Sequence, residues 1–299
     1  MWRRVASSLL FWGLAAFAGG CVDLSKPQAL AGDGTGDRAD AAAAAAADGP
    51  ATPSDTAQEL GTPSPDTSRG EPVADANLAP VPVGHWALDE TTGTTAADSS
   101  AAHNNGKLDG IGGLSWVPGI IGNALSFDGV DDIVRIPYAK PYFPTLADSL
   151  TVSAWVKLGS RAAISPIATT DDGSGGYWLL DVSPGFHPEM NVYSGSCNGH
   201  AASKAEARAD AVLSQNAWHH LAGVLDRASK TVSVYLDGER AAMANAPTTL
   251  DLTCLTNGLT LGAEDASPND HYLQGQIDDV RLYDRALSAA EILGLFRRE

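Results

Sequence analysis

Residues 149–158 read SLTVSAWVKL, and apolar and polar side chains alternate along this run. Side chains of a β-strand point alternately to its two faces, so such a pattern predicts a strand with one buried face. The side chains expected on the buried face are Leu150, Val152, Ala154, Val156 and Leu158. Thr151, Ser153, Trp155 and Lys157 are expected on the other face.

Short runs of the same kind follow on both sides and are closed by Gly, Asp and Asn. Residues 218–225 and 231–236 predict two neighbouring strands, and Asp237-Gly238 supplies the positive-φ residues of a tight hairpin that leads into 240–244. This spacing indicates an all-β sandwich. Further strands are predicted at residues 86–88, 124–127, 133–136, 177–182, 190–193, 259–262 and 276–283.

One short helix is predicted at the C-terminal end. Ser288 and Glu291 form a capping box, in which the serine accepts from a first-turn amide and the glutamate reaches back. Ile292, Leu295 and Phe296 then give a short apolar stripe, so the helix is expected to pack against the sheets.

Six fragments, taken in order, closely resemble the laminin-G-like (concanavalin A-like) domains of bacterial surface proteins. They are WALDE (86–90), GNALSFDGVDD (122–132), VSAWV (152–156), WHH (218–220), YLDG (235–238) and GQIDDVRLYDRALS (275–288). The resemblance implies a jelly-roll sandwich of two antiparallel sheets with the last strand followed by the short helix. It implies much less about the ligand, because this fold hosts lectins, pentraxins, glycosidases and adhesion modules.

The chain divides into three segments: 1–20, 21–82 and 83–299. The first has Arg3-Arg4, an apolar run and small residues before Cys21, which is the layout of a signal peptide. The second is acidic, rich in Ala, Pro, Asp and Thr, and holds no aromatic residue, so it predicts a disordered tether. The third is the laminin-G-like domain.

The signal peptide predicts export, and two cleavage patterns compete. The sequence AGGC (18–21) resembles a bacterial lipobox, which would make Cys21 the lipidated first residue and anchor the protein to a membrane of the cell envelope. The sequence AFA (16–18) fits ordinary signal peptidase and would give a secreted or periplasmic soluble protein. We expect the lipid anchor to be the only contact with a membrane.

The three cysteines support the anchored alternative. In an oxidising compartment an odd cysteine needs an explanation, and acylation of Cys21 leaves Cys197 and Cys254 for one disulfide bond. Residues 194–210 are expected to form a long loop that this bond would pin. Two free thiols are the alternative.

The charge of the chain excludes one class of partner. Nineteen Lys and Arg residues stand against 36 Asp and Glu residues, which gives a net charge of −17. A strongly acidic surface repels phosphate groups, so nucleic acid and anionic membrane surfaces are not expected as partners.

No catalytic motif is found in the sequence. Glycosidases of this fold carry Glu-x-Asp-x-Glu or a close variant on one strand, because retaining hydrolysis needs two carboxyl groups about 5–5.5 Å apart; no such string occurs here. His219-His220 are adjacent on a predicted strand, point to opposite faces, and are not expected to share a metal ion. We therefore predict a protein that is not an enzyme, with a glycoside hydrolase as the weaker alternative.

Acidic loops make Ca²⁺ the cofactor to consider, since Ca²⁺ binds six to eight oxygen ligands. The resemblance to pentraxins, relatives of the same fold, favours Asp171, Asp172, Glu264 and Asp265 as ligands, with His271 standing where that family has a further oxygen. Ordinary turn carboxylates are the alternative. Residues 128–132 are interpreted as a structural turn. In the pair Asp278-Asp279 one carboxylate must face inward, with Arg281 or Arg285 as its partner.

The function predicted from these features is a surface-tethered binding module for a glycan or a protein, through the loops at one edge or the concave face. The aromatic residues considered as a stacking platform, with a place in the core as the alternative, are Tyr177, Trp178, Phe186, Tyr193 and Tyr272. The second hypothesis is a structural or assembly protein that binds a cell-envelope protein without sugar.

Overall fold

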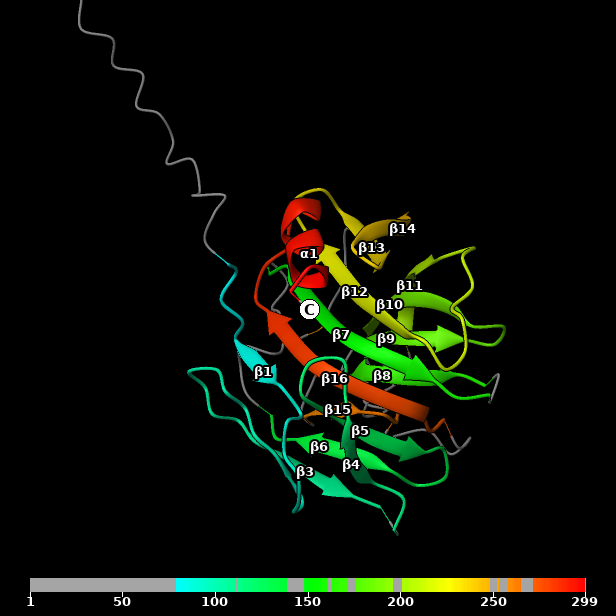
Figure 1. Cartoon of the computed structure of the whole chain (residues 1–299). Helices are drawn as coiled ribbons and strands as arrows, with labels where there is room; N and C mark the ends of the chain where they lie inside the picture. The colour runs from blue at the N-terminus through cyan, green and yellow to red at the C-terminus, as the bar shows by residue number, and fades with distance from the viewer. Residues whose placement is uncertain are drawn as a thin grey trace, which may run out of the picture. The chain divides into compact units, whose positions relative to one another are not determined.

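The computed structural model describes most of the chain after residue 78. The described residues are 79–110, 112–138, 148–160, 163–170, 176–195, 201–247, 252, 258–264 and 271–298, with the backbone alone at 201 and 202. They form two antiparallel sheets and one helix (Figure 1). The predicted signal peptide and nearly all of the predicted tether lie outside the described residues and remain predictions.

Sheet A has eight strands, in the order β14-β13-β12-β7-β16-β5-β4, with β1 paired to β16 beside this path. Neighbouring strands are antiparallel throughout. The strands are β1 Gly84–Trp86, β4 Ser115–Pro118, β5 Asn123–Asp128, β7 Leu150–Leu158, β12 Trp218–Asp226, β13 Thr231–Leu236, β14 Glu239–Asn245 and β16 Gln274–Tyr283.

Sheet B also has eight antiparallel strands, in the order β11-β10-β9-β8-β15-β6-β3-β2. Its strands are β2 Thr95–Ala96, β3 Gly106–Asp109, β6 Ile133–Ile136, β8 Ser165–Thr169, β9 Tyr177–Ser183, β10 His187–Gly195, β11 Ala201–Arg208 and β15 Leu259–Leu261.

The inner faces of the two sheets share one hydrophobic core. Trp86 from sheet A and Trp178 from sheet B are completely buried there, together with alternate side chains such as Leu180, Met190 and Val192. Inward-facing alternate residues are what holds two antiparallel sheets together as a sandwich. The predicted all-β jelly-roll architecture is therefore confirmed.

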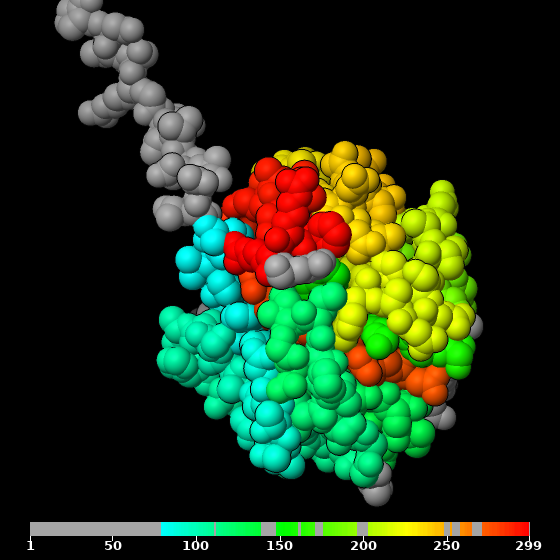
Figure 2. Space-filling view, in the orientation of Figure 1, coloured from blue at the N-terminus to red at the C-terminus, as the bar shows by residue number. Residues whose placement is uncertain are grey.

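The C-terminal helix α1, Ala289–Phe296, begins as predicted. The Ser288 side chain accepts from the Glu291 amide at 3.3 Å, and the Glu291 carboxylate accepts from the Ser288 amide at 2.8 Å. Ile292 and Leu295 are buried in a second, smaller apolar cluster with side chains of β12, β13 and β16. Figure 2 shows the red helix beside the yellow β13–β14 hairpin.

Helix α1 changes one expectation about β7. Thr151, Ser153 and Trp155 were expected on a half-solvated face, but all three are buried. The Trp155 ring centroid lies 5.6 Å from that of Phe296, and the Thr151 hydroxyl hydrogen-bonds the backbone just before the helix. The chain after β16 therefore covers this part of the outer face of sheet A.

The prediction of a loop over residues 194–210 is wrong for 201–208, which form β11 against β10. Ala205 and Ala207 face the core, and charged side chains alternate with them. Alanine gives only a weak alternation signal, which is why this strand was not predicted from the sequence.

His219 and His220 point to opposite faces of β12, as expected. His219 Nδ1 lies 2.9 Å from Asp237 Oδ2. The His220 ring is 2% exposed and meets Trp155 edge-on at a centroid distance of 5.3 Å. Burial lowers the pKa of His220 from 6.5 to about 4, so the imidazole is neutral at neutral pH.

His220 should make the fold sensitive to acid. Its pKa is lower in the folded than in the unfolded chain, so its contribution is fully present above pH 6.5 and is lost as the pH falls towards 4. Between pH 7 and pH 4 the free energy of unfolding should fall about 3 kcal/mol further in the wild type than in His220→Phe. Urea titrations at both pH values measure this difference. His103→Gln, at an exposed histidine, should behave as the wild type; equal pH dependence in His220→Phe would contradict the prediction.

Candidate functional site

The hairpin of β9 and β10 supplies most of the candidate site. Its turn contains Gly185 at φ +91° and Phe186 at φ +67°, and Ser183 pairs with His187 across it. Because Trp178, Leu180 and Val182 point into the core, the alternate residues of β9 face outward. The same alternation in β10 turns its polar side chains to the same outer face of sheet B.

Two carboxylates oppose each other on this outer face. Asp181 of β9 is paired in register with Glu189 of β10, and their exposed fractions are only 3% and 5%. The Asn191 side-chain nitrogen donates to both, at 3.1 Å to Asp181 Oδ1 and at 3.3 Å to Glu189 Oε2. One amide therefore bridges two buried acids, while Asn191 Oδ1 has no hydrogen-bond partner among the described residues.

Burial and neighbouring negative charges both act against the charged form of Asp181. Burial, followed by the charges of Glu189 and Glu264, raises the pKa of Asp181 well above its ordinary value, against the smaller effects of Asn191 and Lys204. Like charges in a desolvated site cannot both ionise easily. The charged form of Asp181 is therefore disfavoured relative to that of an exposed aspartate.

Two tyrosines lie on the same face at the other end of the hairpin, four residues along each strand from the carboxylates. Tyr177 and Tyr193 are paired in register, and their rings stack with centroids 4.3 Å apart and planes 18° from parallel. Lys204 Nζ from β11 lies 5.1 Å from the centroid of the Tyr193 ring and is ion-paired with Glu206. Both tyrosines are half-buried, so part of this aromatic pair is open to solvent.

An arginine lies near the two buried carboxylates. Arg208 Nε donates to Ser183 Oγ at 2.9 Å and lies 3.8 Å from Glu189 Oε1. Its side chain is 42% exposed. With Lys204, it adds cationic donors to a face that otherwise carries hydrogen-bond acceptors. We call this set, Tyr177, Asp181, Glu189, Asn191, Tyr193, Lys204 and Arg208, the hairpin face.

Of the four predicted calcium ligands, the structure describes Glu264 alone. Its Oε2 lies 2.8 Å from His271 Nδ1, so the carboxylate already has a ring nitrogen as its partner. Asp171, Asp172 and Asp265 lie outside the described residues, as do Cys21, Cys197 and Cys254. The calcium site, the lipid anchor and the disulfide therefore remain predictions.

The aromatic candidates separate into two groups. Trp178 is 0% exposed, so the proposal of this residue for a stacking platform is wrong, because the inward phase of β9 places it in the core. Phe186 and Tyr177 are half-buried, and both pack against the core. Tyr177, Tyr193 and Tyr272 keep partial exposure, and the first two form the stacked pair.

The sequence did not predict the pairing of Asp181 with Glu189. A catalytic or binding pair was sought two residues apart on one strand, whereas these acids meet across a hairpin. The signal available was the turn at 184–186: pairing the strands around it places Asp181, Glu189 and Asn191 on one face.

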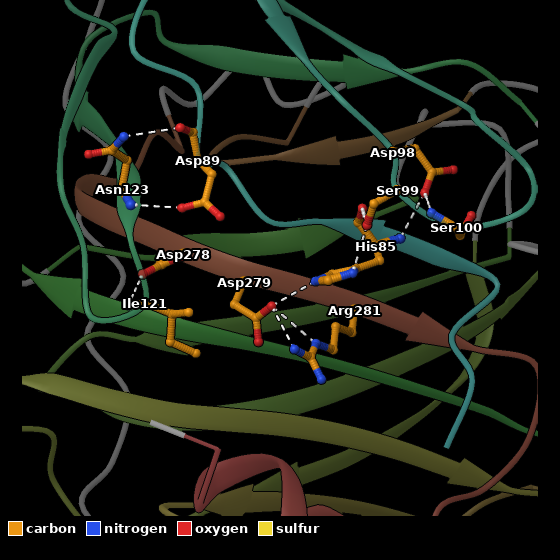
Figure 3. A network of polar contacts seen from close by, with 10 residues as sticks. All are labelled: His85, Asp89, Asp98, Ser99, Ser100, Ile121, Asn123, Asp278, Asp279 and Arg281. Carbon is orange, nitrogen blue, oxygen red and sulfur yellow. Dashed lines mark hydrogen bonds and ion pairs between the residues drawn. The ribbon is translucent and has the colours of Figure 1, made fainter. Parts of the chain in front are cut away.

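A second polar network joins β1 to β16 (Figure 3). His85 Nε2 lies 2.7 Å from Asp279 Oδ1, and His85 Nδ1 lies 2.8 Å from Ser99 Oγ. This order of groups is that of a hydrolytic triad, but the acid is also ion-paired with Arg281 at 3.0 Å. The serine hydroxyl also lies within donating distance, 3.1 Å, of the His85 carbonyl. The network therefore holds the first strand in place.

Backbone amides surround two more carboxylates of this network. Asp98 accepts from the amides of His85, Ser100 and Asn104 at 2.8–2.9 Å, and these bonds outweigh burial and lower its pKa. Asp278 Oδ2 accepts from two amides, those of Ile120 and Ile121, both at 2.9 Å. Burial nevertheless raises the pKa of Asp278 to about 6.

Both acids of the 278–279 pair are therefore buried, since a bulge between Asp278 and Arg281 interrupts the alternation and Asp279 adopts φ +48°. The predicted partner Arg281 is confirmed for Asp279. Arg285, the other candidate, instead binds Glu291, with 2.6 Å between Nη2 and Oε1.

Asp279→Asn should destabilise the fold by about 2–4 kcal/mol, because it leaves Arg281, whose side chain is only 13% exposed, without its counter-charge. Urea unfolding at pH 7 measures the change. The matched control is Asp109→Asn, which breaks the exposed ion pair with Arg135 and should cost less than about 1 kcal/mol. Equal losses in the two variants would refute the role assigned to Asp279.

Two antiparallel sheets packed face to face are the architecture of concanavalin A-like domains. The chain belongs to the concanavalin A-like lectin/glucanase superfamily, whose family model Laminin_G_3 matches residues 128–293. No match is found among curated proteins.

Solved structures with the same fold include domain 4 of a GH43 extracellular arabinanase from Geobacillus stearothermophilus, in complex with arabinotriose. The identity is 20%, the TM-score is 0.56, and the match covers 73% of this chain and 98% of that domain. The binding domain of Paraclostridial Mosquitocidal Protein 1 matches at 13% identity and TM-score 0.54, over 70% of this chain and 52% of that one. The binding domain of botulinum neurotoxin DC in complex with SialylT matches at 12% identity and a TM-score of 0.50, over 72% of this chain and 50% of that one.

These identities support the fold and nothing finer, and the chain spans about half the length of the two toxin domains. Within the described ranges, no helix combines the length and the apolar character needed to cross a lipid bilayer.

Proposed function

We propose that this protein is a non-catalytic, surface-tethered module that binds a glycan on the hairpin face. The observation that carries the proposal is the stacked, half-exposed pair Tyr177–Tyr193 beside Lys204, Arg208 and the bridged carboxylates. Sugar rings present apolar C–H faces and many hydroxyl groups. An aromatic surface beside charged hydrogen-bonding groups suits both.

The fold relatives support this ligand class. One is an arabinanase domain in complex with arabinotriose, and another is a toxin binding domain in complex with SialylT. Neutral and acidic oligosaccharides are therefore both suitable probes. The cationic side chains Lys204 and Arg208 would favour a sugar that carries a carboxylate, and the chain's own acidity would not oppose a neutral one.

Tyr193→Ala should weaken glycan binding at least about tenfold, because it removes both the aromatic surface and the cation–π partner of Lys204. The measurement is affinity for an arrayed panel of neutral and sialylated oligosaccharides, followed by calorimetry on the best probe. Tyr193→Phe, which keeps the ring, should lose less.

Met243→Ala is the matched control, because this side chain is 52% exposed on β14 of the other sheet. It should bind as the wild type. Binding that is equal in Tyr193→Ala and the wild type would refute the hairpin face. No binding to any oligosaccharide, with one stoichiometric cell-envelope protein recovered by cross-linking on intact cells, would favour the assembly hypothesis.

The pair Asp181–Glu189 gives the glycoside hydrolase alternative a specific test. Both groups are nearly inaccessible and share the Asn191 amide, which suits a structural role within the sheet. Turnover of a bound oligosaccharide that disappears in both Asp181→Asn and Glu189→Gln would replace the binding function by catalysis.

Calcium dependence is part of this proposal and rests on Asp171, Asp172, Glu264 and Asp265 as ligands. Thermal unfolding with excess Ca²⁺ and then with chelator tests it in the wild type, Asp171→Ala and Glu264→Ala. A native-state ligand at about a hundred times its dissociation constant adds about 2.7 kcal/mol. A calcium-dependent rise in Tm that is smaller in both variants than in the wild type supports the site; a rise that both variants show in full contradicts it.

The last part of the proposal concerns the location of the protein in or outside the cell. We propose export, lipidation of Cys21 and a flexible tether over 21–82 that holds the module at the bacterial cell envelope, with a secreted or periplasmic soluble form as the alternative. The pair Cys197–Cys254 would add one disulfide bond. Mass spectrometry of the mature protein distinguishes an acylated Cys21 from cleavage after Ala18.

A further inference from the structure

We propose that the turn between β5 and β6 is a second, independent cation site, in which Asp128, Asp131 and Asp132 bind a hard divalent cation such as Ca²⁺. One carboxylate oxygen from each of the three residues lies within 4.8 Å of those of the other two. This site was interpreted from the sequence as a structural turn only, and it lies apart from the hairpin face in the chain.

The buried member of the cluster has an unused ligand atom. Asp132 is 0% exposed; its Oδ2 accepts from the Asp128 amide at 2.8 Å, but its Oδ1 is buried and has no partner in the described part of the chain. A buried carboxylate oxygen without a donor is costly, and a bound cation would remove that cost. The hydrogen bond to the Asp128 amide accounts for one of the two carboxylate oxygens of Asp132.

The glycines before β4 shape the other side of the cluster. A Cβ atom at Gly110 would lie 2.5 Å from Asp132 Oδ1, and one at Gly113 would lie 2.5 Å from Asp132 Oδ2. Gly110 also has φ +150°, which other residues avoid. The absence of side chains at these two positions lets the backbone approach both oxygens of the buried acid.

The local electrostatics are unfavourable without a positive charge. The three carboxylates bring oxygens within 4.8 Å of one another, and Asp132 is buried from the water that would screen their repulsion. Oxygen atoms are the only ligand atoms these three residues offer, which suits Ca²⁺ better than a metal that prefers nitrogen or sulfur. Backbone carbonyls and water would complete its coordination.

The turn also joins the two sheets. Asp128 ends β5 in sheet A, and Ile133 begins β6 in sheet B. A cation held here would fix the crossing between them. This predicts an effect on stability that does not depend on any glycan.

The test is thermal unfolding and calorimetric titration of the whole protein with CaCl₂, against EDTA and NaCl of equal ionic strength. At about a hundred times the dissociation constant, Ca²⁺ should raise Tm by about 5–10 °C. Asp132→Asn and Asp128→Asn should lose the part of this rise, and the binding heat, that belong to one ion. Asp131→Asn, at a ligand less buried than Asp132, should fold normally and bind this Ca²⁺ at least about tenfold more weakly, and it serves if the other two variants fail to fold.

The controls separate this site from the one proposed around Glu264. Glu264→Ala and Asp109→Asn should retain the ion that the aspartate turn binds. A calcium response that is as large in Asp128→Asn, Asp131→Asn and Asp132→Asn as in the wild type would overturn the proposal and assign the ion elsewhere. No response to Ca²⁺, Mg²⁺ or Mn²⁺ in the wild type, with Asp132→Asn more stable in EDTA, would also overturn it and indicate a proton shared by Asp132 and Asp128. Glycan binding by Tyr193→Ala is independent of each of these outcomes.

Discussion

The packing of the two inner sheet faces is the constraint on which the rest of the structure depends. Trp178 and Leu180 of β9 and Met190 of β10 fill the space between the sheets, and a slip of one residue would expose all of them. The register of the hairpin is therefore set by apolar packing. The same register fixes which side chains lie on the outer face of the hairpin, and it brings Asp181 opposite Glu189.

Buried carboxylates occur in two different settings in this domain. Asp98 and Asp279 are surrounded by donors, their pKa values fall, and they serve to fasten β1. Asp132 and Asp181 have fewer donors than they could use or face other carboxylates, and their pKa values rise. The first arrangement stabilises the fold alone. The second carries an energetic cost, and at Asp132 this cost is one reason for assigning a cation to the turn.

The sequence predicted the elements with strong local signals and missed those that depend on partners. Alternation identified β7, and the capping box identified α1, because each signal lies within a few neighbouring residues. Strand β11 was missed because its inward side chains are alanines, which resemble loop composition. The pairing of Asp181 with Glu189 depends on how β9 and β10 align. A search for acids two residues apart on one strand could therefore not find it.

The two candidate sites differ in whether cationic side chains accompany their carboxylates. At the hairpin face Lys204 and Arg208 place cationic donors near two buried carboxylates and beside the half-exposed tyrosines. At the turn after β5 three aspartates meet within 4.8 Å, and one of them is fully buried with an oxygen that lacks a donor. The turn would therefore bind a ligand by its positive charge, whereas the hairpin face would bind a ligand by its shape and hydrogen-bonding groups. The domain can therefore gain stability from a cation at the turn while leaving its binding face free for a sugar.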